Sequence, residues 1–478
     1  MAAARVETDG SRPDDAASRA ALDPAASRAA LDPAASRAAL DPAASRAALD
    51  PAASRAALVV VFLTVFIDLL GFGIVLPVMP RQAEPFLNAL GLSPAAQGAV
   101  IGVLFSSFSL MQFLFSPLWG RLSDRIGRRP MLLLSLAGSV VFYAVYAMAV
   151  LVPADPEPSR ERAALALGLM LLSRIGAGIA GASVGTAAAV IADCTTPENR
   201  ARGMALIGIA FGGGFTLGPL IAYFGLAIFR QQPWGVGAIA SVLSLVAFVI
   251  AATVFRETRP AQGVPERPRS GLGRMATVLG TPAVGALVLV YFLSIVAFAG
   301  FESTLARLTR SAFGMNDHDN FLVFAFIGAM LLIAGGGYRP LAKRFPERRL
   351  LAAGVVLVLL GIGLLGVVAW WVYRDPAAGQ AAAAKAVFYV AAAVAVAGFA
   401  AINPSVSALI SKQADPARQG EVLGVNQSFA SLGRIVGPFL GSFLFGLHPS
   451  HALPFAASVA LLLGVLAVLP RIAGGAPR

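Results

Sequence analysis

Two charged residues lie inside long apolar runs of this chain, where a charge is costly. Asp68 falls within the run at 58–80, and Arg174 falls within the run at 163–192. At roughly 1.5 Å per residue, both reach the middle of a bilayer core about 30 Å thick, where ionisable groups are usually functional. Burial favours the neutral carboxyl and a nearby guanidinium favours the carboxylate. We therefore expect Asp68 and Arg174 to pair, either as a structural salt bridge or as a proton-coupling pair whose separation triggers proton uptake.

Apolar runs of membrane-spanning length supply the elements that must position these two groups. The chain is 57% hydrophobic and 13% charged, whereas soluble domains are about 25% charged. Because lipid-exposed backbone must satisfy its own hydrogen bonds, each run should be a helix. The sequence predicts an all-α membrane protein of twelve transmembrane helices in two six-helix pseudo-repeats, at 58–80, 96–118, 130–152, 163–192, 203–228, 234–255, 281–303, 320–338, 350–373, 385–411, 421–446 and 452–470.

Composition divides the chain into five regions. Residues 1–57 repeat the nine-residue unit AASRAALDP, which offers no continuous apolar face, and we expect a disordered tail. The six-helix halves are predicted at 58–255 and 281–470, joined by an Arg- and Pro-rich linker at 256–280 and followed by a short tail at 471–478. Lys and Arg gather in the loops on the side of both termini, which predicts cytoplasmic termini in a cell inner membrane.

The two halves share one sequence register. Leu122 corresponds to Leu341, and Gly218-Pro219 corresponds to Gly437-Pro438, all at one offset of 219 residues. Repeats of this kind are how many secondary transporters build alternating access around a site near mid-membrane. The offset therefore indicates transport by movement of one half against the other.

The second inner loop reads GRLSDRIGRRP from Gly120 to Pro130. Its glycines permit tight turns and close backbone approach. The loop resembles the signature between helices two and three of the major facilitator superfamily. That resemblance implies a twelve-helix transporter in which the loop latches the two halves at the cytoplasmic side, and it implies that Asp193 pairs with Arg128. The candidate gating residues are Gly120, Asp124, Arg125, Gly127, Arg128 and Asp193.

Spans one and four are similar to those of the drug/proton antiporters, tetracycline exporters in particular. The resemblance rests on DLLGFGIVLP from Asp68 to Pro77 and on RIGAG from Arg174 to Gly178, and it implies proton antiport. Glycine-rich stretches in spans five and eleven are similar to the antiporter signature of this superfamily, although ordinary helix packing explains them equally well. Their residues are Gly214, Gly218, Pro219, Gly433, Gly437 and Pro438.

Other polar residues inside the spans are candidates for lining a substrate cavity. They are Gln112, Glu302, Asn403, Asn426, Gln427 and Arg434. Arg434 is charged and lies within its span, whereas Glu302 falls near a span end and could simply be solvated. Asn403-Pro404 is expected to break span ten near its middle, and such breaks often mark transporter binding sites.

The leading hypothesis is a proton-coupled exporter of small amphipathic organic molecules or drugs. The alternatives are a facilitator or importer of a sugar or organic anion, with Arg174 and Arg434 holding a carboxylate, and a non-transporting membrane sensor. An enzyme is disfavoured, because all three histidines fall in outer loops and no nucleophile–base or metal-ligand cluster appears. We expect a monomer in the bilayer with a small-molecule substrate, no cofactor or metal other than the proton as coupling ion, and no nucleic-acid partner.

Overall fold

The computed structural model describes residues 51–152, 158–196, 200–230, 232–258, 279–414 and 419–470. Within these ranges every regular element is a helix. The repeat tail before residue 51, the linker from 259 to 278 and the tail at 471–478 lie outside the described residues, so their predicted character stays a prediction. Residues 53–478 form one compact unit that contains both predicted halves.

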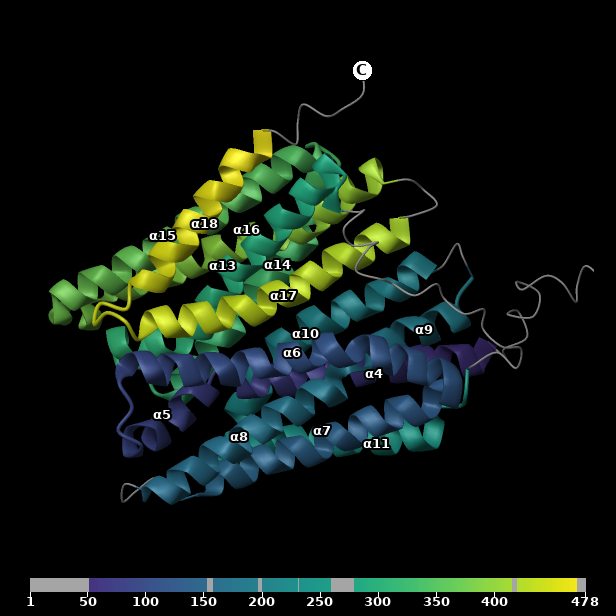
Figure 1. Ribbon diagram of the computed structural model, residues 1–478, viewed down its shortest axis with the longest axis horizontal. Coiled ribbons are helices and arrows are strands. Elements are labelled where there is room, and N and C mark those ends of the chain that lie inside the picture. The colour runs from purple at the N-terminus through teal and green to yellow at the C-terminus, as the bar shows by residue number, and fades with distance from the viewer. Residues whose placement is uncertain are drawn as a thin grey trace, which may run out of the picture. The chain divides into compact units, whose positions relative to one another are not determined.

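The helices of the first half run from purple to teal in Figure 1, and those of the second half run from green to yellow. The first half contains α4 (Pro51–Val75), α5 (Met79–Ala89), α6 (Pro94–Ile126), α7 (Arg128–Leu151), α8 (Arg160–Ala180), η1 (Gly181–Ser183), α9 (Val184–Cys194), α10 (Arg200–Ile228) and α11 (Gly235–Val254). The second contains α13 (Pro282–Phe313), α14 (Asp317–Ala342), α15 (Glu347–Arg374), η2 (Pro376–Gln380), α16 (Ala382–Gln413), α17 (Gln419–Phe445) and α18 (Leu453–Val468).

All twelve predicted spans coincide with helices. Ten helical segments of the described chain are long and apolar enough to cross a membrane. Two shorter apolar helices, Gly212–Ile228 within α10 and Leu453–Val468, supply the other predicted spans. The all-α, twelve-helix prediction is therefore confirmed.

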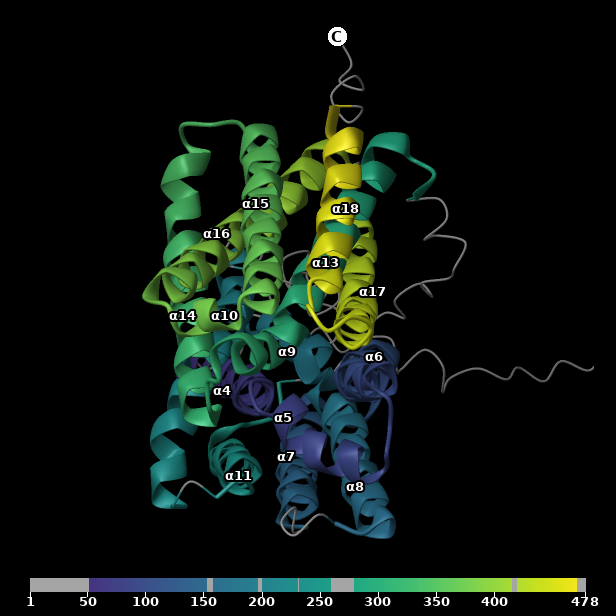
Figure 2. The same ribbon diagram turned by 90° about the vertical axis from the view of Figure 1, so that its left-hand side faces the viewer.

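The two halves meet along α6 with α17 and along α10 with α14 (Figures 1 and 2). The Ser106 hydroxyl of α6 donates a hydrogen bond of 2.6 Å to the Ile435 carbonyl of α17. A Cβ atom at Gly328 of α14 would lie 2.5 Å from the Thr216 Cα of α10. By contrast, a Cβ at Gly120, or at Gly335 and its two successors in α14, would meet nothing within 4 Å. We call the end of the bundle with Gly120–Pro130 the signature end and the other the far end.

Polar caps fix where several helices begin at the far end. Ser93 caps α6 by accepting a hydrogen bond from the Ala96 N–H, and Pro94 occupies the first helical position. Asn316 and Asp319 form a reciprocal capping box at the start of α14. The preceding helix α13 ends at Phe313 and is capped by Gly314, whose φ of 66° is the left-handed conformation that favours glycine. These caps set the sharp turn between α13 and α14.

Two expectations about where helices end or break are wrong. Span one does not continue to residue 80, because α4 ends at Val75 and α5 starts at Met79 after a turn that includes Pro77. Span ten is not broken at Asn403, because α16 runs uninterrupted through Pro404. Among the described residues, the break lies in span four, where the short 3₁₀ segment η1 separates α8 from α9.

Side-chain donors explain the interruption of span four. The Ser135 hydroxyl donates to the Ala180 carbonyl at 2.7 Å, and the Gln112 amide donates to the Gly181 carbonyl at 2.9 Å. Groups that insert in this way into the hydrogen-bond ladder of a helix tighten or bend it. The resulting turn carries Ser183, whose hydroxyl reaches the site described below.

The glycines of the signature in spans five and eleven lie at close helix contacts. A Cβ at Gly218 of α10 would lie 2.9 Å from the Leu70 carbonyl oxygen of α4. A Cβ at Gly437 of α17 would lie 2.7 Å from the Val296 carbonyl oxygen of α13, and Gly441 sits on Gly300 one turn further along. The contact of α10 with α4 in the first half thus corresponds to the contact of α17 with α13 in the second. Close packing of these helix pairs accounts for the glycines.

We expect Gly441→Leu to lower the free energy of unfolding by about 1–3 kcal/mol or more, because its Cβ would stand 2.6 Å from the backbone oxygen of Gly300. The unfolding midpoint in detergent measures this. Gly464→Leu is the matched control, since a Cβ at Gly464 of α18 meets nothing within 4 Å. Equal midpoints for the two variants would contradict the packing role of Gly441.

Candidate functional site

Asp68 lies in the C-terminal part of α4, two turns before its end, and is held by serines from two other helices. Its two carboxylate oxygens accept hydrogen bonds from the Ser139 hydroxyl of α7 at 2.8 Å and the Ser183 hydroxyl of η1 at 3.0 Å. All three residues are buried, with Asp68 at 7% exposure. The Tyr143 hydroxyl donates to the backbone carbonyl of Asp68 at 3.4 Å, and Gly71 leaves room for the Tyr143 ring. The carboxyl therefore sits in a hydroxyl cage that can stabilise its charged form without a cation.

Arg174 lies in α8 but does not form the predicted ion pair with Asp68. Its guanidinium carbon lies 4.6 Å from the Phe108 ring centre and 5.3 Å from the Phe72 ring centre. Its Nε and Nη1 groups are buried and find no acceptor among the described residues. The predicted pairing is therefore wrong for this conformation, because serine hydroxyls bond Asp68 and two aromatic rings flank Arg174.

The contacts of Arg174 offset only part of the free energy that it costs to bury its charge. Cation–π contacts contribute about 2 kcal/mol when the cation is desolvated. Removing an ion from water costs several kcal/mol in real proteins, and unmade hydrogen bonds add to that cost. With Arg174 at 1% exposure, the two rings offset only part of the burial cost. A buried cation with unused donors is typical of a functional group rather than of a structural one.

A cavity lies between the two halves next to this pair of rings. The space that it offers to water-sized spheres is about 40 Å³, so it must widen to admit a drug-sized molecule. The first half contributes an apolar wall with one hydroxyl, and the second contributes a carboxylate and a guanidinium from Glu302 and Arg434. The lining residues are Phe72, Leu76, Phe105, Ser109, Phe215, Ala299, Glu302, Ser303, Arg434 and Pro438. Such a mixture of apolar surface and few polar groups is typical of small-molecule sites.

The remaining predicted cavity residues lie elsewhere in the structure. Gln112 uses its amide on the Gly181 carbonyl, and Asn403 is exposed and accepts a hydrogen bond from Ser407. Asn426 is buried, with a side-chain oxygen that finds no donor in the described chain, and Gln427 is exposed. None of these four residues lines the cavity that contains Glu302 and Arg434. Glu302 and Arg434 do line it, and the position of a residue along its predicted span could not separate these two from the other four.

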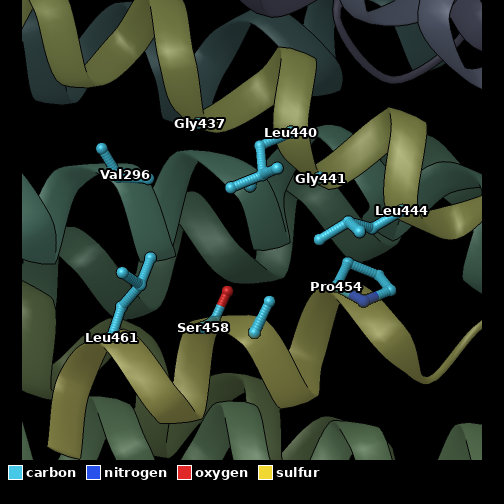
Figure 3. Close-up of a pocket in the computed structure, with 10 residues that line it drawn as sticks. Val296, Gly437, Leu440, Gly441, Leu444, Pro454, Ser458 and Leu461 are labelled. Carbon is cyan, nitrogen blue, oxygen red and sulfur yellow. The ribbon is translucent and has the colours of Figure 1, made fainter. Parts of the chain in front are cut away.

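A second cavity lies inside the second half, between α13, α17 and α18 (Figure 3). Gly437 and Gly441 line it together with apolar side chains, and the Ser458 hydroxyl in its wall donates to the Ala297 carbonyl at 3.3 Å. No charged residue lines this space. We therefore place the candidate substrate site in the cavity between the halves.

Arg128 connects the signature sequence to the end of span four. Its guanidinium donates to Asp193 at 3.1 Å and to the Ser123 hydroxyl at 2.7 Å, and it also pairs with Asp124. The expected contact between Arg128 and Asp193 is therefore present. Arg128 is 2% exposed, so the network is mostly shielded from solvent.

Glu257 also holds the signature sequence, and no motif in the sequence indicated this role. Its carboxylate accepts the backbone N–H groups of Arg128 at 2.8 Å and Arg129 at 3.0 Å, at the positive end of the α7 dipole. Gly127 makes the turn possible with a φ of 113°. Two expectations for this segment are wrong: it is helical up to Ile126, and Gly120 lies inside α6 without a close neighbour. Ser123, Asp124 and Asp193, which bind the Arg128 guanidinium, all lie in the first half, and Glu257 follows it directly.

We expect Arg128→Gln to lower the free energy of unfolding by about 3 kcal/mol, because it leaves the Asp124 and Asp193 carboxylates without their shared cation. The measurement is the unfolding midpoint of purified protein in detergent. Arg129→Gln is the matched control, since Arg129 is exposed and donates only to the Ala252 carbonyl through its side chain. A loss no larger than that of the control would contradict the anchoring role of Arg128.

Ion pairs between the halves close the far end. Arg81 of α5 lies 2.9 Å from Asp317 of α14, and Glu84 lies 2.5 Å from Arg310 of α13. The buried Asn320 amide donates to the Pro77 carbonyl at 2.8 Å, beside the turn between α4 and α5. We call Arg81–Asp317 and Glu84–Arg310 the far-end pairs. They are absent from the sequence predictions, because charges at the ends of spans look like ordinary flanking residues.

Comparisons with known proteins agree with this architecture. The profile of the Major Facilitator Superfamily matches residues 61–373 and 338–477. Major facilitator superfamily domain-containing protein 10 of Bos taurus is 31% identical, over 81% of this chain and 87% of its own length. The class E tetracycline resistance protein of Escherichia coli is 30% identical, over 80% of this chain and 86% of its own.

One solved structure is related both in sequence and in fold. The human organic anion transporter MFSD10 superposes with a TM-score of 0.58 at 26% identity, covering 87% of this chain and 99% of that chain. The D-xylose-proton symporter has a TM-score of 0.65 at 18% identity, which shows the fold alone. From the matched profile and these relatives, the chain belongs to the major facilitator superfamily and is a membrane transporter that resembles the tetracycline exporters.

Proposed function

We propose that this transporter is a proton-coupled exporter of small amphipathic organic molecules, and that it works by alternating access. The observation that carries the proposal is the cavity between the halves, where the apolar surface of Phe72, Phe105 and Phe215 faces Glu302 and Arg434. An amphipathic molecule can place its apolar part on the rings and its polar part on the charged groups. Similarity to a tetracycline resistance protein supports this class of substrate.

Asp68 is the proposed proton site. It is a buried carboxyl in the C-terminal part of a membrane-spanning helix, and its hydroxyl partners Ser139 and Ser183 come from other helices. A rocking movement that displaces α4 from these helices would change the number of donors around the carboxyl. Because hydrogen bonds to a carboxylate favour its charged form, losing them promotes proton uptake. Arg174 belongs to the same region but acts separately from Asp68 in this conformation.

The far-end pairs join the two halves at the far end, whereas the described ion pairs of Arg128 and of Lys412 at the signature end each stay within one half. We assign the signature end to the cytoplasm, in agreement with the positive-inside rule and with insertion in a cell inner membrane. In that orientation the far-end pairs join the halves on the outer side, which is the arrangement expected of a state that receives a molecule from the cytoplasm. Transport then requires the far-end pairs to break while the signature end closes.

A transporter of organic anions is the second candidate. Arg434 in the cavity wall and Arg174 behind it provide positive charge, and the human relative of known structure is an organic anion transporter. A carboxylate could be held by either guanidinium through paired hydrogen bonds. Both candidate functions use the same cavity, and they differ in whether the substrate must carry a negative charge.

Purified protein in proteoliposomes with an internal pH indicator tests the proposal. We expect tetracyclines and amphipathic dyes to stimulate proton flux, and sugars to have no effect. Stimulation by organic anions alone would favour the second candidate. Lack of any stimulated flux across tetracyclines, dyes, sugars and organic anions would overturn both and favour a non-transporting sensor.

A further inference from the structure

One aromatic ring separates the Arg174 guanidinium from the cavity between the halves. Phe72 lines that cavity, whereas Arg174 does not. The guanidinium carbon lies 5.3 Å from the Phe72 ring centre and 4.6 Å from the Phe108 ring centre. Arg174 is 1% exposed, and Phe72 contacts both its guanidinium and the cavity, so rotation of the Phe72 side chain offers a route between them.

No anion of the described chain neutralises this guanidinium. Asp68 is the acidic residue predicted to do so, and its oxygens are taken by Ser139 and Ser183. The described ion pairs all involve other residues, and the Nε and Nη1 groups of Arg174 have no acceptor. Unused guanidinium N–H donors in a buried site are suited to a carboxylate or a similar delocalised anion.

Arg434, the other arginine of this region, is in a different situation. It lines the cavity directly and donates a hydrogen bond to the Ser431 hydroxyl at 3.2 Å. The carboxylate of Glu302, which carries the opposite charge, lines the same cavity. An incoming anion at Arg434 would therefore meet a carboxylate nearby. At Arg174 it would meet unused donors and two rings.

We infer that Arg174 is the receptor for an acidic group of the transported molecule, and that Phe72 is the ring that turns away to admit it. The inference rests on the proposed function, since it places the polar part of an amphipathic substrate within the same site. It assigns substrate recognition to Arg174 and leaves proton coupling to Asp68. Phe72 is then a positioning residue, because it controls access to the group that binds.

A matched pair of probes tests this assignment on the full-length protein in detergent. 2-Naphthoate and 2-naphthamide have nearly the same shape and differ in charge, and calorimetric titration gives their dissociation constants. We expect naphthoate to bind about tenfold more tightly than naphthamide, as for a charge-assisted hydrogen-bonded contact. Arg174→Gln should reduce this ratio to about one, whereas Arg434→Gln should keep it.

Phe72→Leu tests the positioning role without removing a charge. It should raise the preference for naphthoate over naphthamide several-fold, because no ring has to turn before Arg174 is reached, whereas the lost apolar contact weakens both probes alike. The inference is overturned if wild type does not prefer naphthoate, if Arg434→Gln abolishes the preference, or if Arg174→Gln keeps it. Should Arg174→Gln not fold, an unchanged ratio of naphthoate to naphthamide binding in Phe72→Leu overturns it instead. Proton-coupled tetracycline movement could persist through any of these results, so the two proposals fail separately.

Discussion

Asp68→Asn should reduce proton-driven substrate movement to the level of protein-free liposomes while leaving substrate exchange intact. The variant keeps the side-chain size and can still bond to the Ser139 and Ser183 hydroxyls, so α4, α7 and η1 should stay packed. It cannot gain or lose a proton. Since only a titratable group can couple the movement of protons to that of another solute, exchange without a pH gradient is the activity expected to survive. Counter-flow of labelled tetracycline at equal pH, compared with uptake under a pH gradient, measures both activities.

Asp68→Glu is the matched control for this prediction, because it restores a titratable carboxyl at the same position. We expect it to regain part of the proton-driven movement. Full pH coupling in Asp68→Asn would show that another carboxyl, with Glu302 in the cavity wall as the first to examine, carries the proton.

Removing the acids of the far-end pairs should shift the protein away from the described conformation. In Glu84→Gln/Asp317→Asn, Arg81 and Arg310 lose their partners. Partly exposed pairs contribute about 0.2–1 kcal/mol each, so losing two changes the conformational equilibrium by about tenfold. The direction follows from their position, because these pairs join the halves only in the conformation whose far end is closed.

Spin labels at Leu122 and Leu341, both exposed and related by the repeat offset, would report the separation of the halves at the signature end. With Cys194 replaced by serine, electron–electron resonance should show a larger population of short distances in the double variant. Glu161→Gln/Asp375→Asn is the control, since it removes two exposed acids that form no ion pair between the halves in the described structure. The same distance distribution in both variants would contradict a gating role for the far-end pairs.

Hydropathy was sufficient to predict the fold, because a bilayer leaves a long apolar segment few alternatives to a helix. The boundaries that failed depend on contacts remote in sequence. Span four is interrupted because Gln112 and Ser135 of other helices bond its carbonyls, and no pattern within the span carries that information. Asn403-Pro404 has the expected composition for a break, yet α16 accommodates it.

The sequence was sufficient to identify individual residues of the candidate site but not the contacts between them. Charge inside an apolar run identified Asp68, Arg174 and Arg434, since each is expensive to bury. Their partners could not be predicted, because serines and phenylalanines are common in membrane helices and their register on neighbouring helices is set by packing. Ser183 and Phe108 carried no signal of their own, whereas Arg81 and Glu84, three residues apart on one helix, could have suggested a charged contact surface.

Proton antiport is the central claim, and reversal of the pH gradient tests it most directly. Proteoliposomes are equilibrated with tetracycline at equal concentration on both sides, and a pH gradient of either sign is then imposed. Antiport predicts net tetracycline movement into the more acidic compartment in both cases, beyond that in protein-free liposomes and in Asp68→Asn. Net movement that is independent of the sign of the gradient, or equal to these two controls, would contradict the account.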